Sequence, residues 1–524
     1  MRILMIVAVV SIFSGGILDA QVKTAKGAIK GSSSSDGRIR IFKGIPYAAP
    51  PVGELRWKEP RPAAAWTGLR DATEFGAHCV QGPVFGDITF KRPASEDCLY
   101  LNVWTPAKGA ADRVPVMVWI HGGGFQAGAG PEARHDGEVF ARKGVVLVSL
   151  NYRLGVFGFF SHPELTKESG RNASGNYGLL DQVAALEWVK ENIAAFGGNP
   201  DNVTIFGESA GSLAVSALMA SPLATGLFHK AIGESGAYFT AGGGLPLQPL
   251  PASEQQGAAF TTSIGAASLA ALRSKPAEEV LQAAMKVRPW FSPNLDGYFL
   301  REDLYSIYGA GKQAHVPLLA GWNADEVRVG VVLGKDRPTR ATFIEQTRKR
   351  FGDHADAVLA AYAATDDAEA VESAAALASD MFIGHATWKW IEMHAKTGKA
   401  PVYRYSFDRK IPVAPDEKFN GVSATSRDIG ARHAGEIQYV FGTLDTVPKV
   451  TWEPSDRKLS DAMTAYWTNF ARTGDPNGPG LPAWSRYDGT KRVLHLDETI
   501  REAADAQRPR YEAIDAFADK QRTR

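Results

Sequence analysis

A short glycine-flanked segment carries the clearest chemical signal in the sequence. Residues 207–211 read GESAG, directly after the apolar run VTIF and directly before a run of small residues with helical character. A serine hydroxyl is a poor nucleophile until a base takes its proton, and a G-x-S-x-G turn between strand and helix exposes that hydroxyl. The pattern predicts that Ser209 is a nucleophile. The plainer alternative is a tight turn in which the glycines only supply the conformation.

A second segment could hold the negative charge that such a nucleophile creates. Three consecutive glycines stand in HGGGF, after the apolar run at Val114–Ile120. Glycines leave backbone N–H groups open to a ligand, and the N–H of Ala210 would be free at the start of a helix. A phosphate loop is the alternative, but no Lys-Ser/Thr follows and no dinucleotide pattern fits. We therefore expect an oxyanion cradle.

The elements that position these segments follow from the apolar pattern. Residues 179–200 show apolar positions three and four apart that stop at two glycines and a proline, which predicts a helix. Continuous apolar strands alternating with helices predict an α/β fold with a large, mostly parallel central sheet that helices flank on both faces. The expected strands are Val114–Ile120, Val145–Tyr152, Val203–Phe206, Val316–Trp322 and Val402–Phe407.

Residues 21–524 are expected to form a single domain, because no proline- or glycine-rich linker divides them. The serine-rich stretch Gly31–Gly37 is interpreted as the loop of an N-terminal β-hairpin. Two stretches rich in Ala, Glu and Lys, at about 241–288 and 336–399, are interpreted as helical cap or insert regions on the sheet.

The first twenty residues have the pattern of a signal peptide. Arg2 precedes the apolar run Ile3–Phe13, and a cut between Ala20 and Gln21 would follow. Leu18 is not small, so the cleavage site is approximate. An uncleaved lipid-embedded anchor is the alternative, but the run is too short for a comfortable membrane span. The pattern predicts export to the periplasm or the extracellular space.

Composition narrows the possible partners. Lys and Arg number 58 against 57 for Asp and Glu, which leaves no electrostatic footprint for nucleic acid or an anionic membrane. Cys79 and Cys98 are the only cysteines, and in an exported chain such a pair is expected to be oxidised. Two unrelated buried thiols are the alternative. No H-E-x-x-H or other ligand spacing predicts a metal site, and no cofactor is expected.

Several longer segments resemble the type-B carboxylesterase family, which includes the cholinesterases, within the α/β-hydrolase superfamily. The resemblance extends from about residue 22 to residue 500. It rests on FKGIPYAAPPVGELRW (Phe42–Trp57), SEDCLYLNVWTP (Ser95–Pro106), HGGGF (His121–Phe125), NYRLGVFGF (Asn151–Phe159), GNYGLLDQ (Gly175–Gln182), FGGNPDNVTIFGESAG (Phe196–Gly211), LDGYFL (Leu295–Leu300) and YWTNFARTGDPN (Tyr466–Asn477).

The resemblance implies a catalytic triad that spacing alone does not reveal. Its acid would be Glu326 in GWNADEVR, and its base would be His433 in RHAGEIQYVFG. The chain order Ser209, Glu326, His433 matches the superfamily's order of nucleophile, acid and base. The implied oxyanion donors are the N–H groups of Gly123, Gly124 and Ala210.

The resemblance also implies several neighbours of the triad. Ser235 would lie close to it, and Glu208 would be a structural or water-ordering neighbour that is not a triad member. The family's first disulfide would be Cys79–Cys98. The family's buried pair of an acid and an arginine would be Glu96 with Arg153.

The sequence departs from the family pattern at two places. Val327 follows the expected acid where glycine is usual, and Asp325 beside it is a competing choice. The loop between the two cysteines lacks the tryptophan with which cholinesterases hold a quaternary ammonium group. Phe85 and Phe90 lie in that loop but need not face the site, so a preference for choline esters is not expected.

The implied function is an exported serine carboxylic ester hydrolase that acts on a small-molecule ester through an acyl-enzyme, without a cofactor. One alternative keeps the mechanism but places it on an amide, carbamate, polyester-like or toxin ester bond. Another is an inactive homologue that serves in binding or adhesion. The sequence does not indicate the oligomeric state.

Overall fold

The computed structural model describes residues 20–85, 88, 92–240, 245–419 and 421–522. Most of the predicted signal peptide and Phe90 lie outside these residues. Within them, no helix is both long and apolar enough to cross a membrane.

One large sheet organises the molecule and contains 11 strands. The central neighbours from β10 to β19 run parallel, whereas the flanking strands pair antiparallel. The fold prediction of a mostly parallel sheet is confirmed. In spatial order the strands are β20 (Arg501–Ala504), β19 (Arg492–Leu496), β16 (Val402–Phe407), β15 (Leu318–Asn323), β12 (Lys230–Glu234), β11 (Gly198–Glu208), β9 (Val114–Ile120), β10 (Val146–Leu150), β8 (Tyr100–Thr105), β4 (Arg40–Pro46) and β3 (Ser32–Ser33).

Helices cover both faces of this sheet, as the continuous apolar strands predicted. In β9, Val116, Val118 and Ile120 pack into one hydrophobic core, while Met117 and Trp119 pack into the core on the other face. All five side chains are fully buried. The first core includes α4 (Tyr177–Asn192), α5 (Ala210–Ala220) and α14 (His385–Thr397), and the second includes α1 (Glu138–Arg142), α16 (Ile437–Phe441) and α17 (Pro454–Thr473).

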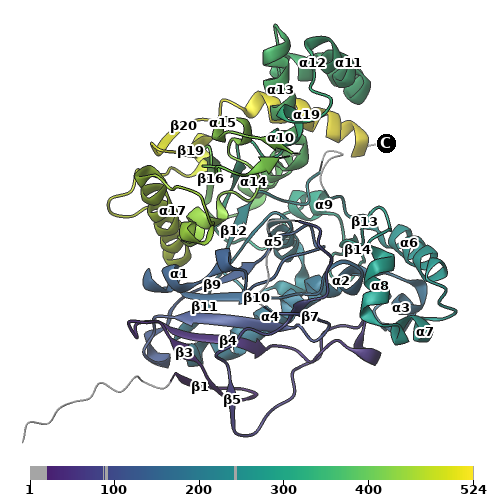
Figure 1. Cartoon of the computed structure of the whole chain (residues 1–524), viewed down its shortest axis with the longest axis vertical. Helices are drawn as coiled ribbons and strands as arrows, with labels where there is room; N and C mark the ends of the chain where they lie inside the picture. Colours follow the sequence, from purple (N-terminus) through teal and green to yellow (C-terminus); the bar gives the residue numbers. More distant parts are fainter. Residues whose placement is uncertain (1–19, 86–87, 89–91, 241–244, 420, 523–524) are drawn as a thin grey trace, which may run out of the picture.

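Two groups of helices lie at the periphery (Figure 1). The first group is α6 (Leu250–Ser263), α7 (Leu269–Ser274) and α8 (Ala277–Ala284), beside α3 (Pro163–Glu168). The second is α11 (Arg340–Phe351), α12 (Ala355–Ala361) and α13 (Asp367–Ser379), beside the C-terminal α19 (Arg508–Arg522). A small hydrophobic core, separate from the two cores of the sheet, joins this second group to α19. It includes Phe343, Val358 and Ile514.

The N-terminal region forms two short antiparallel pairs. β1 (Gln21–Thr24) pairs with β2 (Gly27–Lys30), and β3 pairs with β4 through Ser32 opposite Ile41. The expected loop at Gly31–Gly37 is therefore shorter than the sequence suggested, because Ser32 and Ser33 already belong to a strand.

The remaining short elements connect these layers. They are β5 (Leu69–Asp71), β6 (His78–Cys79), β7 (Ala94–Ser95), α2 (Gly155–Phe159), β13 (Gln248–Pro249), β14 (Asn294–Leu295), α9 (Leu304–Gly309), α10 (Arg328–Val332), β17 (Lys418–Phe419), β18 (Val422–Ser423), α15 (Ser426–Ile429) and α18 (Tyr487–Thr490), with short 3-10 turns and one π-helical turn between them.

Candidate active site

Ser209 occupies a strained turn between β11 and α5. Its backbone has φ 54° and ψ −121°, a region that residues with side chains seldom adopt. Its N–H donates to the carbonyl of Glu234 at 2.9 Å, which fixes the turn against β12. The flanking glycines are required by close packing, because a Cβ on Gly211 would lie 2.0 Å from the carbonyl oxygen of Ile120. The hydroxyl therefore stands at the carboxyl edge of the sheet.

His433 joins the serine to a carboxylate. Its Nε2 lies 2.9 Å from Ser209 Oγ, and its Nδ1 lies 2.6 Å from Glu326 Oε2. Glu326 is buried, and its other oxygen accepts the backbone N–H of Asn323 at 2.9 Å. The structure thus brings together three residues, each of which lies more than a hundred positions from the other two along the chain.

The loop after β15 selects between the two adjacent acids. Asp325 Oδ2 accepts the N–H of Ala431 at 3.0 Å, so its side chain is turned to the backbone of the His433 loop. Of these two acids, Glu326 is the one whose carboxylate contacts the imidazole. Val327, where the family has glycine, has φ −130°, a value that any residue adopts. Valine therefore fits the backbone conformation at this position without strain.

Among the described residues, the backbone N–H groups of Gly123, Gly124 and Ala210 have no backbone acceptor outside the regular elements. Gly123 and Gly124 have φ values of +102° and +61°, and a Cβ on Gly123 would lie 2.1 Å from the carbonyl oxygen of Ala127. Ala210 begins α5, where the first N–H groups lack an intrahelical partner. Unpaired donors of this kind can bind an oxyanion.

Two more buried carboxyl groups surround the imidazole. Glu208 Oε1 lies 3.3 Å from His433 Nε2 and has no hydrogen bond of its own in the structure. Glu436 accepts the side-chain N–H of Asn323 at 2.6 Å and the hydroxyl of Ser235 at 3.5 Å. Glu208 thus contacts the imidazole directly, whereas Ser235 contacts Glu436.

These carboxylates set the protonation of the site. Burial lowers the pKa of His433, but the charges of Glu208 and Glu326 outweigh burial and raise the pKa to about 10. Burial raises the pKa of Glu208 to about 8 and the pKa of Glu436 to about 7. The imidazole and the two acids interact strongly enough that their titrations are coupled and belong to the group as a whole.

One contact of the imidazole comes from a residue that no sequence pattern singles out. The Phe382 ring lies 5.2 Å from the His433 ring, centroid to centroid, with the two planes at 79°. Phe382 stands in a π-helical turn at Asp380–Gly384, between α13 and α14. A π-turn of this kind leaves no recognisable sequence pattern, so no signal could have found it.

Comparison with known proteins identifies the family. The chain matches the sequence model of the carboxylesterase family over residues 18–514. The chain belongs to this family. It is 37% identical to the fumonisin B1 esterase of Sphingopyxis macrogoltabida, over 91% of this chain and 86% of that protein. It is 36% identical to the para-nitrobenzyl esterase of Bacillus subtilis, over 91% of this chain and 95% of that protein.

Solved structures agree with this assignment. The Geobacillus stearothermophilus carboxylesterase EST55 superposes with a TM-score of 0.80 at 33% identity, over 94% of this chain and 99% of that one. A para-nitrobenzyl esterase structure superposes with a TM-score of 0.77 at 34% identity, over the same shares. The molecule is therefore a carboxylic ester hydrolase with the α/β fold that the sequence predicted.

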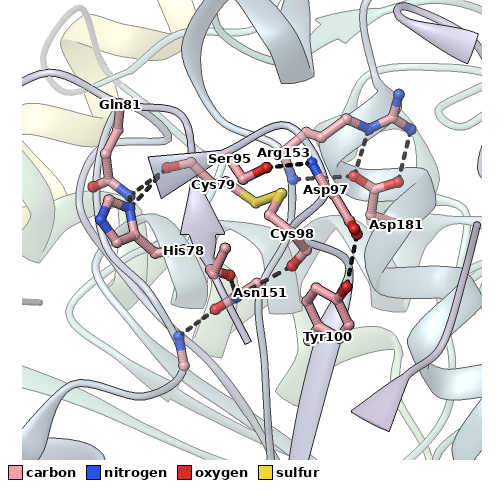
Figure 2. Close-up of a disulfide and its surroundings, with 12 residues drawn as sticks. His78, Cys79, Gln81, Ser95, Asp97, Cys98, Tyr100, Asn151, Arg153 and Asp181 are labelled. Carbon is pink, nitrogen blue, oxygen red and sulfur yellow. Dashed lines mark hydrogen bonds and ion pairs between the residues drawn. A yellow bond between two sulfur atoms is a disulfide. The ribbon is translucent and has the colours of Figure 1, made fainter. Parts of the chain in front are cut away.

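The two cysteines of this carboxylesterase form the expected disulfide (Figure 2). Cys79 and Cys98 are both buried, and their Cα atoms are 5.0 Å apart. Asn151 donates to the carbonyl of Cys98 at 3.2 Å and accepts the N–H of Gly130 at 2.9 Å. The bond thus lies against the loop that follows the three glycines.

The segment after Cys79 reaches the edge of the candidate site. Gln81 forms two hydrogen bonds with Gly128, of 2.7 and 3.0 Å, which dock this segment onto the glycine loop. Phe85 is 41% exposed, and its Cζ lies 3.8 Å from the position of a Cβ on Gly124. The carboxylesterase therefore has a phenylalanine beside one candidate oxyanion donor.

The expected pair of Glu96 with Arg153 is wrong. Arg153 instead binds Asp181 through two hydrogen bonds of 2.7 and 2.8 Å, which Figure 2 shows to one side of the disulfide. Glu96 binds Arg56 at 2.5 and 2.7 Å. Asp181 on α4 is fully buried and also accepts the Arg153 backbone N–H at 3.0 Å, so one carboxylate satisfies both the side chain and the backbone of this arginine.

Proposed function

We propose that this carboxylesterase is an exported serine hydrolase that cleaves carboxylic esters through an acyl-enzyme. The observation that carries the proposal is the continuous chain of hydrogen bonds from Ser209 through His433 to Glu326. A serine hydroxyl with a base in hydrogen-bond reach, itself oriented by a carboxylate, is the arrangement that activates a serine nucleophile.

In the first half of the reaction Ser209 Oγ attacks the ester carbonyl while His433 Nε2 takes its proton. The carbonyl oxygen becomes an oxyanion, which the N–H groups of Gly123, Gly124 and Ala210 bind. Glu326 holds the imidazole in the tautomer that accepts at Nε2 and favours the imidazolium that forms. His433 then gives the proton to the leaving alkoxide, and the alcohol departs from the acyl-enzyme.

In the second half water replaces the alcohol. His433 takes a proton from this water, whose oxygen attacks the acyl carbonyl and forms a second oxyanion in the same cradle. The tetrahedral species collapses, His433 returns the proton to Ser209 Oγ, and the carboxylic acid leaves. Each proton therefore moves through one nitrogen, Nε2, which is the atom 2.9 Å from the serine oxygen.

Rapid-mixing kinetics with p-nitrophenyl butyrate test this mechanism. An acyl-enzyme that accumulates predicts a burst of p-nitrophenol that approaches one equivalent per active site, followed by slower turnover. The corresponding p-nitroanilide tests the amide alternative. Fumonisin B1 tests the toxin-ester alternative, which the fumonisin B1 esterase among the relatives favours. Turnover of the anilide at a rate equal to the ester would contradict assignment as an ester hydrolase.

The charge of the alcohol group provides a prediction about substrate choice. The segment between Cys79 and Cys98 lacks tryptophan, and Phe85 offers a weaker surface for a cation than an indole does. Butyrylcholine is therefore expected to have a kcat/KM no higher than that of a neutral butyrate ester of similar size. A preference of about tenfold or more for the cationic ester, roughly 1.4 kcal/mol, would show that another aromatic site binds the ammonium group.

The pH dependence of kcat/KM is expected to show how the carboxylates next to His433 shift its pKa. Only the neutral imidazole accepts the serine proton, so kcat/KM rises as pH rises through the pKa of His433. Because Glu208 and Glu326 raise this pKa, the acid limb should lie above the ordinary value of about 6.5. Ionised Glu208 lies 3.3 Å from Nε2 and stabilises the imidazolium, so Glu208→Gln should move the limb to lower pH by on the order of one unit.

The control for that experiment is Glu279→Gln, an exposed acid that pairs with Lys275. It should leave the profile unchanged. Profiles from about pH 5 to about pH 10.5 with a neutral ester would distinguish the two variants. A wild-type limb at or below about 6.5, or a limb that Glu208→Gln does not move, would contradict the stated role of the carboxylates.

Export is the final part of the proposal, and the N-terminal sequence pattern and the disulfide support it. The carbonyl of Ala20 accepts the N–H of Gly31 at 2.7 Å, so a cut between Ala20 and Gln21 would remove this bond, whereas a cut one or more residues earlier would keep it. Sequencing the N-terminus of the protein from culture medium or periplasm should give a start within a few residues of Gln21. A chain that retains Met1 in the membrane fraction would contradict export with cleavage.

A further inference from the structure

The π-helical turn at Asp380–Gly384 contacts the base of the proposed triad. Its Phe382 ring meets the His433 ring in an edge-to-face arrangement, at 5.2 Å and 79°. The His433 side chain is 26% exposed, so the surrounding protein does not enclose it completely. π-turns inside helices are frequent at functional sites. Phe382 is thus a neighbour that can restrict the rotation of an otherwise partly open ring.

The residue just before this turn contacts the loop of the proposed acid. Ser379, at the end of α13, is buried, and its Oγ accepts the N–H of Val327 at 3.2 Å. Val327 directly follows Glu326 in the chain. One four-residue segment, 379–382, therefore contacts both the loop that carries the carboxylate and the ring of the imidazole.

The same segment is also anchored by the C-terminal helix. Asp380 is buried, accepts the hydroxyl of Tyr362 at 2.6 Å and forms an ion pair of 2.8 Å with Arg510 of α19. The Arg510 guanidinium also lies over the Tyr362 ring, 4.6 Å from its centroid. The position of the π-turn is therefore fixed by groups that do not themselves contact His433 among the described residues.

We infer that Phe382 is a positioning residue for His433, and that Arg510 acts on the same reaction by holding Asp380 and thereby the turn. The inference rests on the proposed triad. Proton transfer requires Nε2 to stay within reach of Ser209 while Nδ1 stays on Glu326, and small displacements of such groups are costly. Phe382 limits the ring to the orientation that satisfies both contacts. The C-terminal helix is in this way part of the support of the active site.

Variants at Phe382 test the first step. Phe382→Ala is expected to lower kcat for p-nitrophenyl acetate by on the order of 10²-fold, with a much smaller change in KM, because a small substrate has little need of this ring. Phe382→Leu keeps most of the volume without the aromatic edge and should fall between the alanine variant and the wild type. Active-site titration with a fluorophosphonate normalises each rate to the folded fraction.

Variants on the C-terminal helix test the second step and provide a matched control. Arg510→Met removes the ion pair to Asp380 and should lower kcat by about three- to tenfold without a change in KM. Arg508→Met removes a cation from the same helix, but Arg508 pairs with Glu392 at 3.0 Å, so kcat should remain that of the wild type. The low-field proton resonance of the Nδ1–H bound to Glu326 should broaden in both Phe382→Ala and Arg510→Met, and not in Arg508→Met.

Three results would overturn the inference. Wild-type kcat in Phe382→Ala and Phe382→Leu would show that the ring does not position the base. Equal losses in Arg508→Met and Arg510→Met would show that docking of α19 matters only as a whole. An unchanged low-field resonance would assign any loss to substrate contact. Failure of the triad itself has a different signature, because Ser209→Ala would then retain activity.

Discussion

Ser209→Ala is expected to lower kcat for p-nitrophenyl butyrate by on the order of 10⁴ or more. The variant removes the atom that bonds to the acyl group but keeps the oxyanion donors, so KM should change far less than kcat. The strained turn depends on Gly207, Gly211 and the backbone of residue 209, so the fold should tolerate the loss of one hydroxyl. Steady-state kinetics with active-site titration measure the effect.

A matched serine variant is the control for this experiment. Ser212 is fully buried one turn further along α5, where its hydroxyl donates to the carbonyl of Gly236 at 2.5 Å. Ser212→Ala should retain kcat within a few fold while losing about 1 kcal/mol of stability. A Ser209→Ala variant that retains more than about one-hundredth of kcat would remove Ser209 from the mechanism.

The second large effect is expected at the acid. Glu326→Gln should lower kcat by on the order of 10³–10⁴, with a much smaller effect on KM. The amide keeps the shape of the carboxylate but removes the charge that favours the imidazolium, 2.6 Å from Nδ1. It also presents an NH₂ group that can impose the wrong tautomer on His433. Pre-steady-state acylation rates separate this loss from an effect on deacylation.

The adjacent acid, Asp325, is the control. It is also a carboxylic acid, but its side chain points to the N–H of Ala431 and not to the His433 ring. Asp325 accepts the N–H of Ala431 and lies 3.8 Å from Arg328, so Asp325→Asn should leave most activity and cost about 1 kcal/mol of stability. An inactive Asp325→Asn together with an active Glu326→Gln would show that Asp325 completes the triad.

The fold could be predicted to a large extent because its strands are buried on both faces. The runs at Val114–Ile120 and Val402–Phe407 coincide with β9 and β16, since uninterrupted apolar residues mark a central strand. The run Val203–Phe206 identified only the buried part of β11, which begins at Gly198. Residues 199–202 are partly or fully exposed and three of these four residues are polar, so the pattern could not reveal them.

The candidate site could be predicted where a local segment determines it and less well where side chains meet across the fold. The turn at Ser209 could be predicted from five residues. Glu326 and His433 required the family resemblance, since nothing in their spacing links them to Ser209. The prediction that Glu96 pairs with Arg153 was wrong, because the partner of Arg153 depends on where α4 places Asp181 in the fold. Phe382 could not be found because its π-turn follows no hydrophobic period.

The central claim is that Ser209 is the residue that becomes acylated. It is tested most directly by treating the wild-type protein with a fluorophosphonate, which reacts with an activated serine, and mapping the adduct by peptide mass spectrometry. We expect one adduct per chain, on Ser209, with loss of esterase activity in proportion to labelling. An adduct on another residue that abolishes activity, or full activity after complete labelling of Ser209, would contradict the proposed mechanism.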